Sequence, residues 1–292
     1  MVERPRVMMD VRRSLKTVLL GVHRRIAPAG ASKRTVVLCY HSVHSTTPFA
    51  SATPRVFEQH LIWLKQHCTI VPFSQITAVV SGSGEGYPCV AITFDDGYVD
   101  NYECAFPLLQ RYEVPATFFL TVGFMERDPA VVERFEILRR TRAEDLHSLT
   151  WVQAREMLRA GMEVGAHTYS HPNLARLDRP AAEVELRRSK EIMEDRLGQR
   201  ISLLAYPFGR PKLNFTSETV EVVAQVEYEY AAAATSRAVR VTDCRLVIPR
   251  FFATGVDVST LASIIRGDWD VLGYWQERAP LFLQKRGQSD VA

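Results

Sequence analysis

The chain has little of what would mark a disulfide-stabilised, nucleic-acid-binding or membrane-spanning protein. Its five cysteines are odd in number and scattered, and no two form a Cys-x-x-Cys pair. The sequence therefore predicts no disulfide framework and favours a reducing compartment. No apolar run reaches the ~20 residues that a membrane-spanning helix needs. The net charge of +3 is too mild to indicate a nucleic-acid partner. With 292 residues and 47% hydrophobic content, the chain can bury a sizeable core.

Acidic residues are scarce near the N-terminus. Residues 1–34 contain nine Lys or Arg residues and only two acids, around a short apolar stretch at 18–22. Arg24 and Arg25 stand where a signal peptide would need small residues for cleavage. Two interpretations fit equally: an amphipathic basic helix on an anionic membrane surface, or a disordered or surface-packed basic arm. We expect a cytoplasmic protein, with peripheral contact at the inner membrane in the first case.

Apolar runs typical of buried strands alternate with amphipathic helical segments. This alternation predicts an α/β fold with a mainly parallel sheet. A single-domain (β/α) barrel of about seven strands, covering residues 35–292, is the most economical arrangement, with a charged insertion near 126–148. The expected strands span residues 35–41, 90–94, 116–122, 162–166, 201–206, 230–235 and 246–250.

Chemically reactive side chains stand where four of these strands end. They are His41, the pair Asp95 and Asp96, His167, and the aromatic segment that begins at Tyr206. In a parallel barrel the C-terminal ends of the strands share one face, where functional residues gather. The coincidence predicts a single site built from all four strand ends.

The strand at 90–94 ends abruptly in two adjacent carboxylates and Gly97. Two neighbouring acids that face the same cavity repel each other, so each needs a different partner. A metal ion for one and a proton-handling role for the other would resolve the conflict. The alternative is a solvated Asp-Asp-Gly turn, which is the more common context of this tripeptide.

His167 and His171 are four residues apart, directly after a short strand. At this spacing two imidazoles can bind one metal ion. The pair alone is a weak signal, but Gly165, Pro172 and a carboxylate from another strand strengthen it. Two imidazole nitrogens and one Asp oxygen suit a catalytic Zn²⁺ or a similar ion that keeps open positions for water and substrate.

The two motifs, Thr93-Phe94-Asp95-Asp96-Gly97 followed by His167-x-x-x-His171, resemble those of the polysaccharide deacetylases with the NodB homology domain (carbohydrate esterase family 4). The resemblance runs from about residue 36 to residue 250. It implies a distorted (β/α) barrel that removes acetyl groups from N-acetylated sugars with the help of a metal ion.

Carried over by position, the resemblance makes Asp95 the catalytic base. It makes Asp96, His167 and His171 the ligands of a divalent metal ion. We expect Zn²⁺ first, with Co²⁺, Ni²⁺ and Mn²⁺ as alternatives.

Residues 204–209 resemble the third motif of this family, with one departure. The resemblance implies that the backbone N–H of Phe208 stabilises the oxyanion, while Tyr206 and Phe208 could wall the substrate pocket. The family's third motif also brings an arginine that holds the catalytic base, and Ala205 stands in that position. Arg250, at the end of the last predicted strand, is the substitute by location.

The general acid is the second departure, because no histidine follows His171 where the family has one. Tyr40-His41-Ser42-Val43 resembles the subgroup of poly-N-acetylglucosamine deacetylases, in which an early histidine is the acid. His41 is therefore the candidate acid, with an ordinary pKa near ~6.5. The alternative is a core histidine bonded to the backbone. Four other histidines are expected at the surface: His44, His60, His67 and His147.

Three functions remain open at this point. The first is metal-dependent N-deacetylation of an N-acetylated saccharide or a glycolipid precursor. The second keeps the site but acts on a non-sugar amide or imide, because the catalytic motifs do not encode the pocket. The third is a degenerate member that binds saccharide without turning it over, which the two departures from the family pattern motivate.

Overall fold

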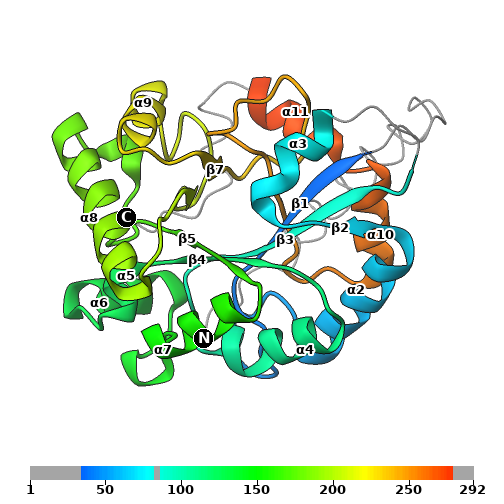
Figure 1. Cartoon of the computed structure of the whole chain (residues 1–292), viewed down its shortest axis with the longest axis horizontal. Helices are drawn as coiled ribbons and strands as arrows, with labels where there is room; N and C mark the ends of the chain where they lie inside the picture. Colours follow the sequence, from blue (N-terminus) through cyan, green and yellow to red (C-terminus); the bar gives the residue numbers. More distant parts are fainter. Residues whose placement is uncertain (1–33, 82–85, 279–292) are drawn as a thin grey trace, which may run out of the picture.

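The computed structural model describes residues 34–81 and 86–278, which form one parallel sheet surrounded by helices (Figure 1). The strand order is β7-β6-β5-β4-β3-β1-β8, and β2 pairs with β3 beside this path. An isolated parallel bridge joins Ala232 of the edge strand β7 to Ile248, three residues before the other edge strand β8, as fits a distorted (β/α) barrel. This confirms the predicted fold class. The strands are β1 (Thr35–Tyr40), β2 (Thr69–Ile70), β3 (Cys89–Phe94), β4 (Thr117–Leu120), β5 (Glu163–Ala166), β6 (Leu203–Ala205), β7 (Tyr230–Ala232) and β8 (Phe251–Phe252).

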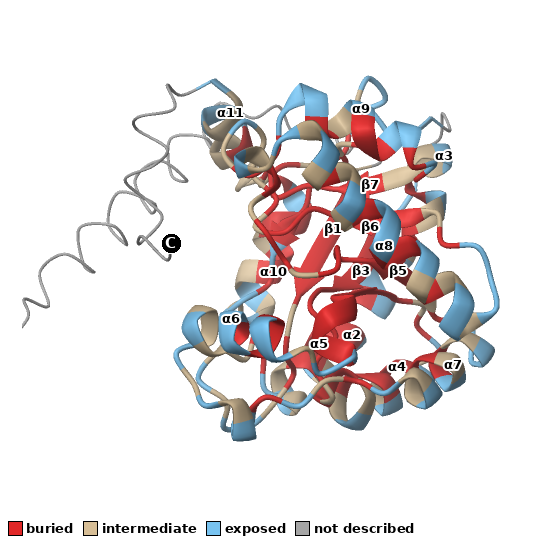
Figure 2. Cartoon of the chain, turned by 90° about the vertical axis from the view of Figure 1, so that its left-hand side faces the viewer, coloured by how far each residue is buried: buried red, intermediate tan, exposed pale blue. Residues whose placement is uncertain are grey.

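The helices pack around the sheet, with their exposed residues on the outside and the buried strands within (Figure 2). Their ends follow local sequence signals. Thr150 and Gln153 form a capping box that begins α7, while Asp178 caps α8 and Gly198 ends it in the left-handed conformation. The α-helices are α2 (Pro54–His67), α3 (Ile76–Ser81), α4 (Phe106–Arg111), α5 (Val122–Met125), α6 (Pro129–Arg139), α7 (Trp151–Arg159), α8 (Arg179–Leu197), α9 (Ser217–Gln225), α10 (Val258–Arg266) and α11 (Asp270–Arg278).

The central strands are buried on both faces, which explains why they are continuous apolar runs in the sequence. Every residue of β1 and β3 is buried, as expected for a parallel sheet covered on both sides. Gly165 in β5 has no room for a side chain, because a Cβ atom there would lie 2.7 Å from the Phe119 ring and 2.8 Å from Leu203 Cβ. This close packing fixes the strand that leads into His167.

The last predicted strand is wrong in position. Residues 246–250 form no strand, and the ladder with β1 is made instead by Phe251 and Phe252 of β8. Pro249 explains the shift, because proline has no N–H to donate to a strand ladder. Arg250 therefore precedes β8 rather than ending a strand of its own.

His60 is fully buried in α2, so the prediction that it lies at the surface is wrong. The hydroxyl of Tyr40 and Nδ1 of His60 are 2.9 Å apart and share a hydrogen bond. His60 stands three residues after Phe57 and four before Leu64, both buried, and this spacing places it on the helix face that packs against the sheet.

The basic arm predicted for residues 1–34 lies outside the described residues, apart from Arg34. The Arg34 guanidinium donates two hydrogen bonds of 2.9 Å to Asp270 at the start of α11. Of the helices in 34–81 and 86–278, none combines the length and the apolar character that crossing a membrane requires.

Candidate active site

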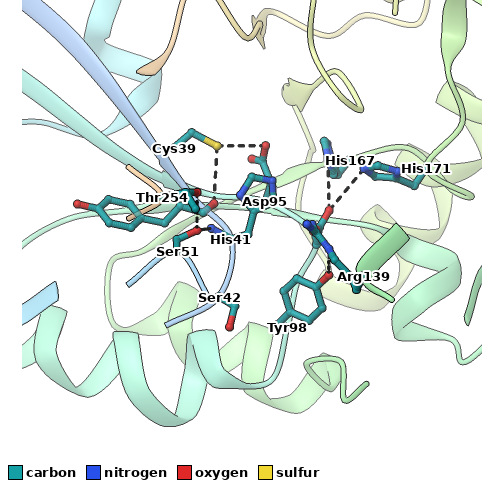
Figure 3. A network of polar contacts seen from close by, with 12 residues as sticks. Cys39, His41, Ser42, Ser51, Asp95, Tyr98, Arg139, His167, His171 and Thr254 are labelled. Atoms are coloured by element: carbon teal, nitrogen blue, oxygen red, sulfur yellow. Dashed lines mark hydrogen bonds and ion pairs between the residues drawn. The ribbon is translucent and has the colours of Figure 1, made fainter. Parts of the chain in front are cut away.

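The structure brings the predicted strand-end residues together. His41 follows β1, Asp95 and Asp96 follow β3, and His167 follows β5. Because these strands are parallel, their C-terminal ends open onto the same face of the sheet. The side chains of His41, Asp95, His167 and His171 gather in one region there (Figure 3).

Four residues of this region have a left-handed backbone. The φ angles are +76° at Asp96, +64° at Thr168, +55° at His171 and +59° at Phe208. Residues other than glycine rarely adopt this conformation, and it persists only where the surroundings hold it. Such residues cluster at functional sites, so the backbone conformation at these strand ends indicates a functional site.

Asp96, His167 and His171 form a compact, buried cluster. Oδ1 of Asp96 lies 3.6 Å from Nε2 of His167 and 3.5 Å from Nε2 of His171. Nδ1 of His167 donates to the carbonyl of Ala205 at 2.8 Å. That bond fixes the proton on Nδ1 and leaves the lone pair of Nε2 directed at Asp96, as in many metal sites.

The protonation states of the cluster suit a metal ion. Burial lowers the pKa of His171 to about 3, so its imidazole is neutral at neutral pH. Burial opposes ionisation of Asp96, but the positive charge of Arg139 outweighs it and lowers the pKa of that carboxyl. Metal ligands need neutral imidazoles and ionised carboxylates.

Within the described chain, Oδ1 of Asp96 is buried without a hydrogen-bond partner. A buried carboxylate oxygen without a hydrogen-bond partner costs free energy, and a cation held between it and the two imidazole nitrogens would remove that cost. The ligand atoms of Asp96, His167 and His171 lie within 4.8 Å of one another. The three residues therefore fit a divalent metal ion.

Asp95 is held by Arg250 through two parallel hydrogen bonds. Nη1 donates to Oδ1 and Nη2 donates to Oδ2, both at 2.8 Å, and both side chains are buried. The thiol of Cys39 also donates to Oδ2, at 3.4 Å. Burial would raise the pKa of Asp95, but the charge of Arg250 outweighs it and lowers that pKa to about 2. Asp95 is therefore an ionised carboxylate fixed in one orientation.

The guanidinium that is missing at Ala205 thus comes from Arg250. Ala205 is buried in β6, and its carbonyl serves the site by accepting the hydrogen bond from His167. Arg250 reaches Asp95 from the segment before β8, which pairs with β1 next to β3. The contact expected from position 205 is made here from a different segment of the chain.

His41 is held by its backbone. Its N–H donates to Oγ of Ser51 at 2.9 Å, and its carbonyl accepts from Nδ2 of Asn101 at 2.7 Å. The ring stacks on Phe252 with 5.7 Å between centroids, and a ring nitrogen lies within 4.8 Å of an Asp95 carboxylate oxygen. Burial lowers the pKa of His41 to about 4, so the expected value near 6.5 is wrong. The imidazole is neutral at neutral pH.

A cavity of about 340 Å³ opens onto these residues, a size that suits one small ligand group. Tyr206 and Phe208 both line it, as predicted for pocket walls. Tyr206 is nearly fully buried, donates from its hydroxyl to the Leu246 carbonyl at 2.9 Å and stacks on Phe215 at 3.8 Å. The ring of Phe208 is more open to the cavity and packs edge-on against His171 at 4.8 Å.

The sequence profile of the family described as polysaccharide deacetylase matches residues 83–231, just over half of the chain. The matched segment contains Asp95, Asp96, His167 and His171. The chain belongs to the polysaccharide deacetylase family.

Relatives of this polysaccharide deacetylase are distant. YxkH of Bacillus subtilis, itself assigned as a polysaccharide deacetylase, is 28% identical over 198 residues, which cover 66% of this chain and 62% of YxkH. The chain thus spans less than two thirds of that protein. The poly-beta-1,6-N-acetyl-D-glucosamine N-deacetylase of Staphylococcus aureus is 24% identical over 215 residues, covering 68% of this chain and 67% of the relative.

Two solved structures share the fold. The Streptococcus pyogenes deacetylase PplD, in complex with acetate, has a TM-score of 0.67 at 22% identity and covers 80% of this chain and 98% of its own. IcaB of Ammonifex degensii has a TM-score of 0.64 at 24% identity with the same coverage. At these identities the two structures support the barrel architecture of the family.

Sequence reasoning missed one charged residue of this site, Arg139 at the end of α6. Its Nη2 forms an ion pair with Oδ2 of Asp96, and its Nε donates to the hydroxyl of Tyr98 at 2.6 Å (Figure 3). Arg139 lies in a segment dense in both charge signs, where nothing local distinguishes it from its neighbours. Only the contact that the end of α6 makes with Asp96 identifies it.

The contact between the thiol of Cys39 and Asp95 was also missed. A signal was available, because alternate residues of a strand point to the same face. Cys39 stands two residues before His41, so a catalytic role for His41 implies that Cys39 faces the same side of the sheet.

Proposed function

We propose that this protein is a metal-dependent hydrolase that removes N-acetyl groups from an amino-sugar polysaccharide or a glycolipid precursor and releases acetate. One observation carries the proposal. An ionised carboxylate, Asp95, lines the same cavity as the two histidines of a separate Asp-His-His cluster, in a member of the polysaccharide deacetylases. Hydrolysis of an amide by water is served by a general base that stands next to a set of metal ligands.

Asp96, His167 and His171 would hold the ion, with Zn²⁺ as the first candidate and Co²⁺, Ni²⁺ and Mn²⁺ as alternatives. When bound, such an ion supplies a Lewis acid that polarises the acetyl carbonyl and makes water a stronger nucleophile. The bond from His167 to the Ala205 carbonyl orients the first imidazole for this role.

Asp95 acts as the general base and accepts a proton from the attacking water. Arg250 holds both oxygens of Asp95 and keeps the carboxylate ionised, so the base is ready at neutral pH. Within the described part of the chain, the backbone N–H of Phe208 meets no acceptor. It is therefore available to stabilise the oxyanion that forms on the acetyl carbonyl.

His41 returns the proton to the leaving amine. Because His41 is neutral in the resting site, the proton that it gives must first arrive during the reaction, and Asp95 is the nearby donor. The carbon–nitrogen bond then breaks, the sugar nitrogen takes the proton as an amine, and the acetyl group leaves as acetate.

The basic composition of residues 1–34 supports a proposal for the location in the cell where the protein acts. We propose that the protein works in the cytoplasm, peripherally at the inner membrane, where lipid-linked or nascent saccharides carry N-acetyl groups. Nucleic acid is not among the proposed partners, since the net charge is only +3. Recovery of a processed, secreted protein in cell fractionation would contradict this location.

Acetate release from N-acetylglucosamine oligosaccharides tests the function directly. We expect exhaustive chelation to reduce release to background, and addition of Zn²⁺, Co²⁺, Ni²⁺ or Mn²⁺ to restore it, because the Lewis acid supplies the main activation. Full activity after chelation would contradict the metal site. Hydrolysis of non-sugar amides instead would favour an amidase, and saccharide binding without acetate release would favour a degenerate member.

Replacement of His41 by Ala is expected to lower kcat by ~10²-fold or more, since a positioned general acid is typically worth that much. The loss should shrink for an N-acetyl substrate whose leaving amine is an aryl amine, which leaves with less need of a proton. Replacement of the exposed His67 by Ala serves as the control. An equal loss for both substrates would remove His41 from the acid role.

A further inference from the structure

Arg139 occupies a fixed position at the edge of the proposed metal site. Nη2 pairs with Oδ2 of Asp96, and Nε donates to the Tyr98 hydroxyl. The guanidinium carbon lies 5.6 Å from the ring centre of Tyr98 and 5.8 Å from that of Phe49. The side chain also lines the catalytic cavity and is mostly buried. Together, Tyr98, Phe49 and Asp96 fix the position of the Arg139 guanidinium beside the Asp96 carboxylate.

The two oxygens of Asp96 have different surroundings. Oδ2 accepts from Arg139, whereas Oδ1 faces Nε2 of His167 and of His171 and has no hydrogen-bond partner in the described residues. Arg139 therefore balances the charge of Asp96 without covering the atom that would bind a metal ion. Both the guanidinium and an ion could contact the same carboxylate at once.

The two carboxylates of the buried site are each paired with a guanidinium group before any metal ion binds. Asp95 pairs with Arg250, and Asp96 pairs with Arg139, which makes two carboxylates and two guanidinium groups. A divalent cation that enters this site meets no uncompensated negative charge, and it is repelled by the guanidinium on the other oxygen of its own ligand. The loaded site would carry excess positive charge, which favours an anion that forms in the cavity.

We propose that Arg139 is a permanent counter-cation of Asp96 that weakens metal binding and leaves excess positive charge facing the substrate carbonyl. The inference rests on the proposed function only in using its metal site. If Arg139 only oriented Asp96, its replacement would weaken metal binding, because a ligand that loses the residue positioning it binds metal less tightly. The sign of the change in affinity therefore distinguishes the two roles.

Zn²⁺ affinity of the full chain, measured by competition with a chromophoric chelator, tests the proposal. We expect R139M and R139Q to bind Zn²⁺ ~10–100-fold more tightly than wild type, the range over which residues around metal ligands act. R139K keeps the charge and should bind as wild type does. R142M is the matched control, since Arg142 pairs with two exposed acids, Glu144 and Asp145, which stand two and three residues further along the chain.

Thermal unfolding gives a second readout. Without metal, R139M should have a lower Tm than wild type because Asp96 loses its counter-charge, and Zn²⁺ should raise its Tm by more than it raises that of wild type. Unchanged or weaker Zn²⁺ binding in both neutral variants would overturn the proposal. If wild type binds Zn²⁺ no better than D96N, the metal site of the proposed function fails instead.

Discussion

Replacement of Asp95 by Asn is expected to lower kcat for acetate release by ~10²–10⁴-fold, the usual contribution of a general base. An amide cannot take the proton from water, while its size and shape match those of the carboxylate. The metal cluster should remain, because the ligand atoms belong to Asp96, His167 and His171. Initial rates of acetate release at saturating metal measure the effect.

The amide also loses one of the two acceptors that Arg250 contacts, so stability must be measured beside activity. E163Q is the control, since it removes a comparable carboxylate charge away from the site. Glu163 stands at the start of β5, the end opposite to His167, where it accepts hydrogen bonds from Ser74 and Thr117. E163Q should retain wild-type turnover. Wild-type turnover in the Asp95→Asn variant would show that another group is the base.

Replacement of Arg250 by Met is expected to destabilise the protein by about 3–5 kcal/mol, the usual cost of leaving one partner of a buried ion pair without the other. Arg250 is 1% exposed and supplies two of the hydrogen bonds to Asp95. Without its charge, burial raises the pKa of Asp95 toward and beyond the ordinary value. Activity should therefore be lost at low pH first, as a growing fraction of Asp95 becomes protonated.

Urea unfolding and the pH profile of kcat measure the two consequences of Arg250→Met. R237M is the matched control, because Arg237 is also buried and pairs with Asp243, outside the catalytic cavity. It should lose comparable stability but keep the wild-type pH profile. If Arg250→Met kept the wild-type profile as well, Arg250 would be a structural residue without influence on the base.

Local sequence signals predict most of the fold because they act within one element. The buried strands β1 and β3 are continuous apolar runs, and the caps at Thr150 and Asp178 mark helix starts within a few residues. The position of β8 was not predictable in this way. Its two residues are defined by pairing with β1, some 200 residues earlier in the chain, and Pro249 removes the strand that the apolar run suggested.

In the candidate site, too, local patterns could be predicted from the sequence, whereas contacts between distant segments could not. The spacing of His167 and His171 and the adjacent acids at 95 and 96 are local patterns, and the structure brings these four residues together. The partners of the two acids, Arg139 and Arg250, come from α6 and from the segment before β8. Contacts between segments so far apart in sequence have no local signature, and neither does the burial that lowers the pKa of His41.

We propose that the two adjacent acids have separate roles, with Asp95 as the base and Asp96 as the metal ligand. Metal content per chain, measured together with acetate release for the Asp95→Asn and Asp96→Asn variants, tests it most directly. We expect Asp95→Asn to bind one ion but release almost no acetate, whereas Asp96→Asn should lose both. Retention of the ion by Asp96→Asn, or its loss from a folded Asp95→Asn variant, would contradict this division of roles.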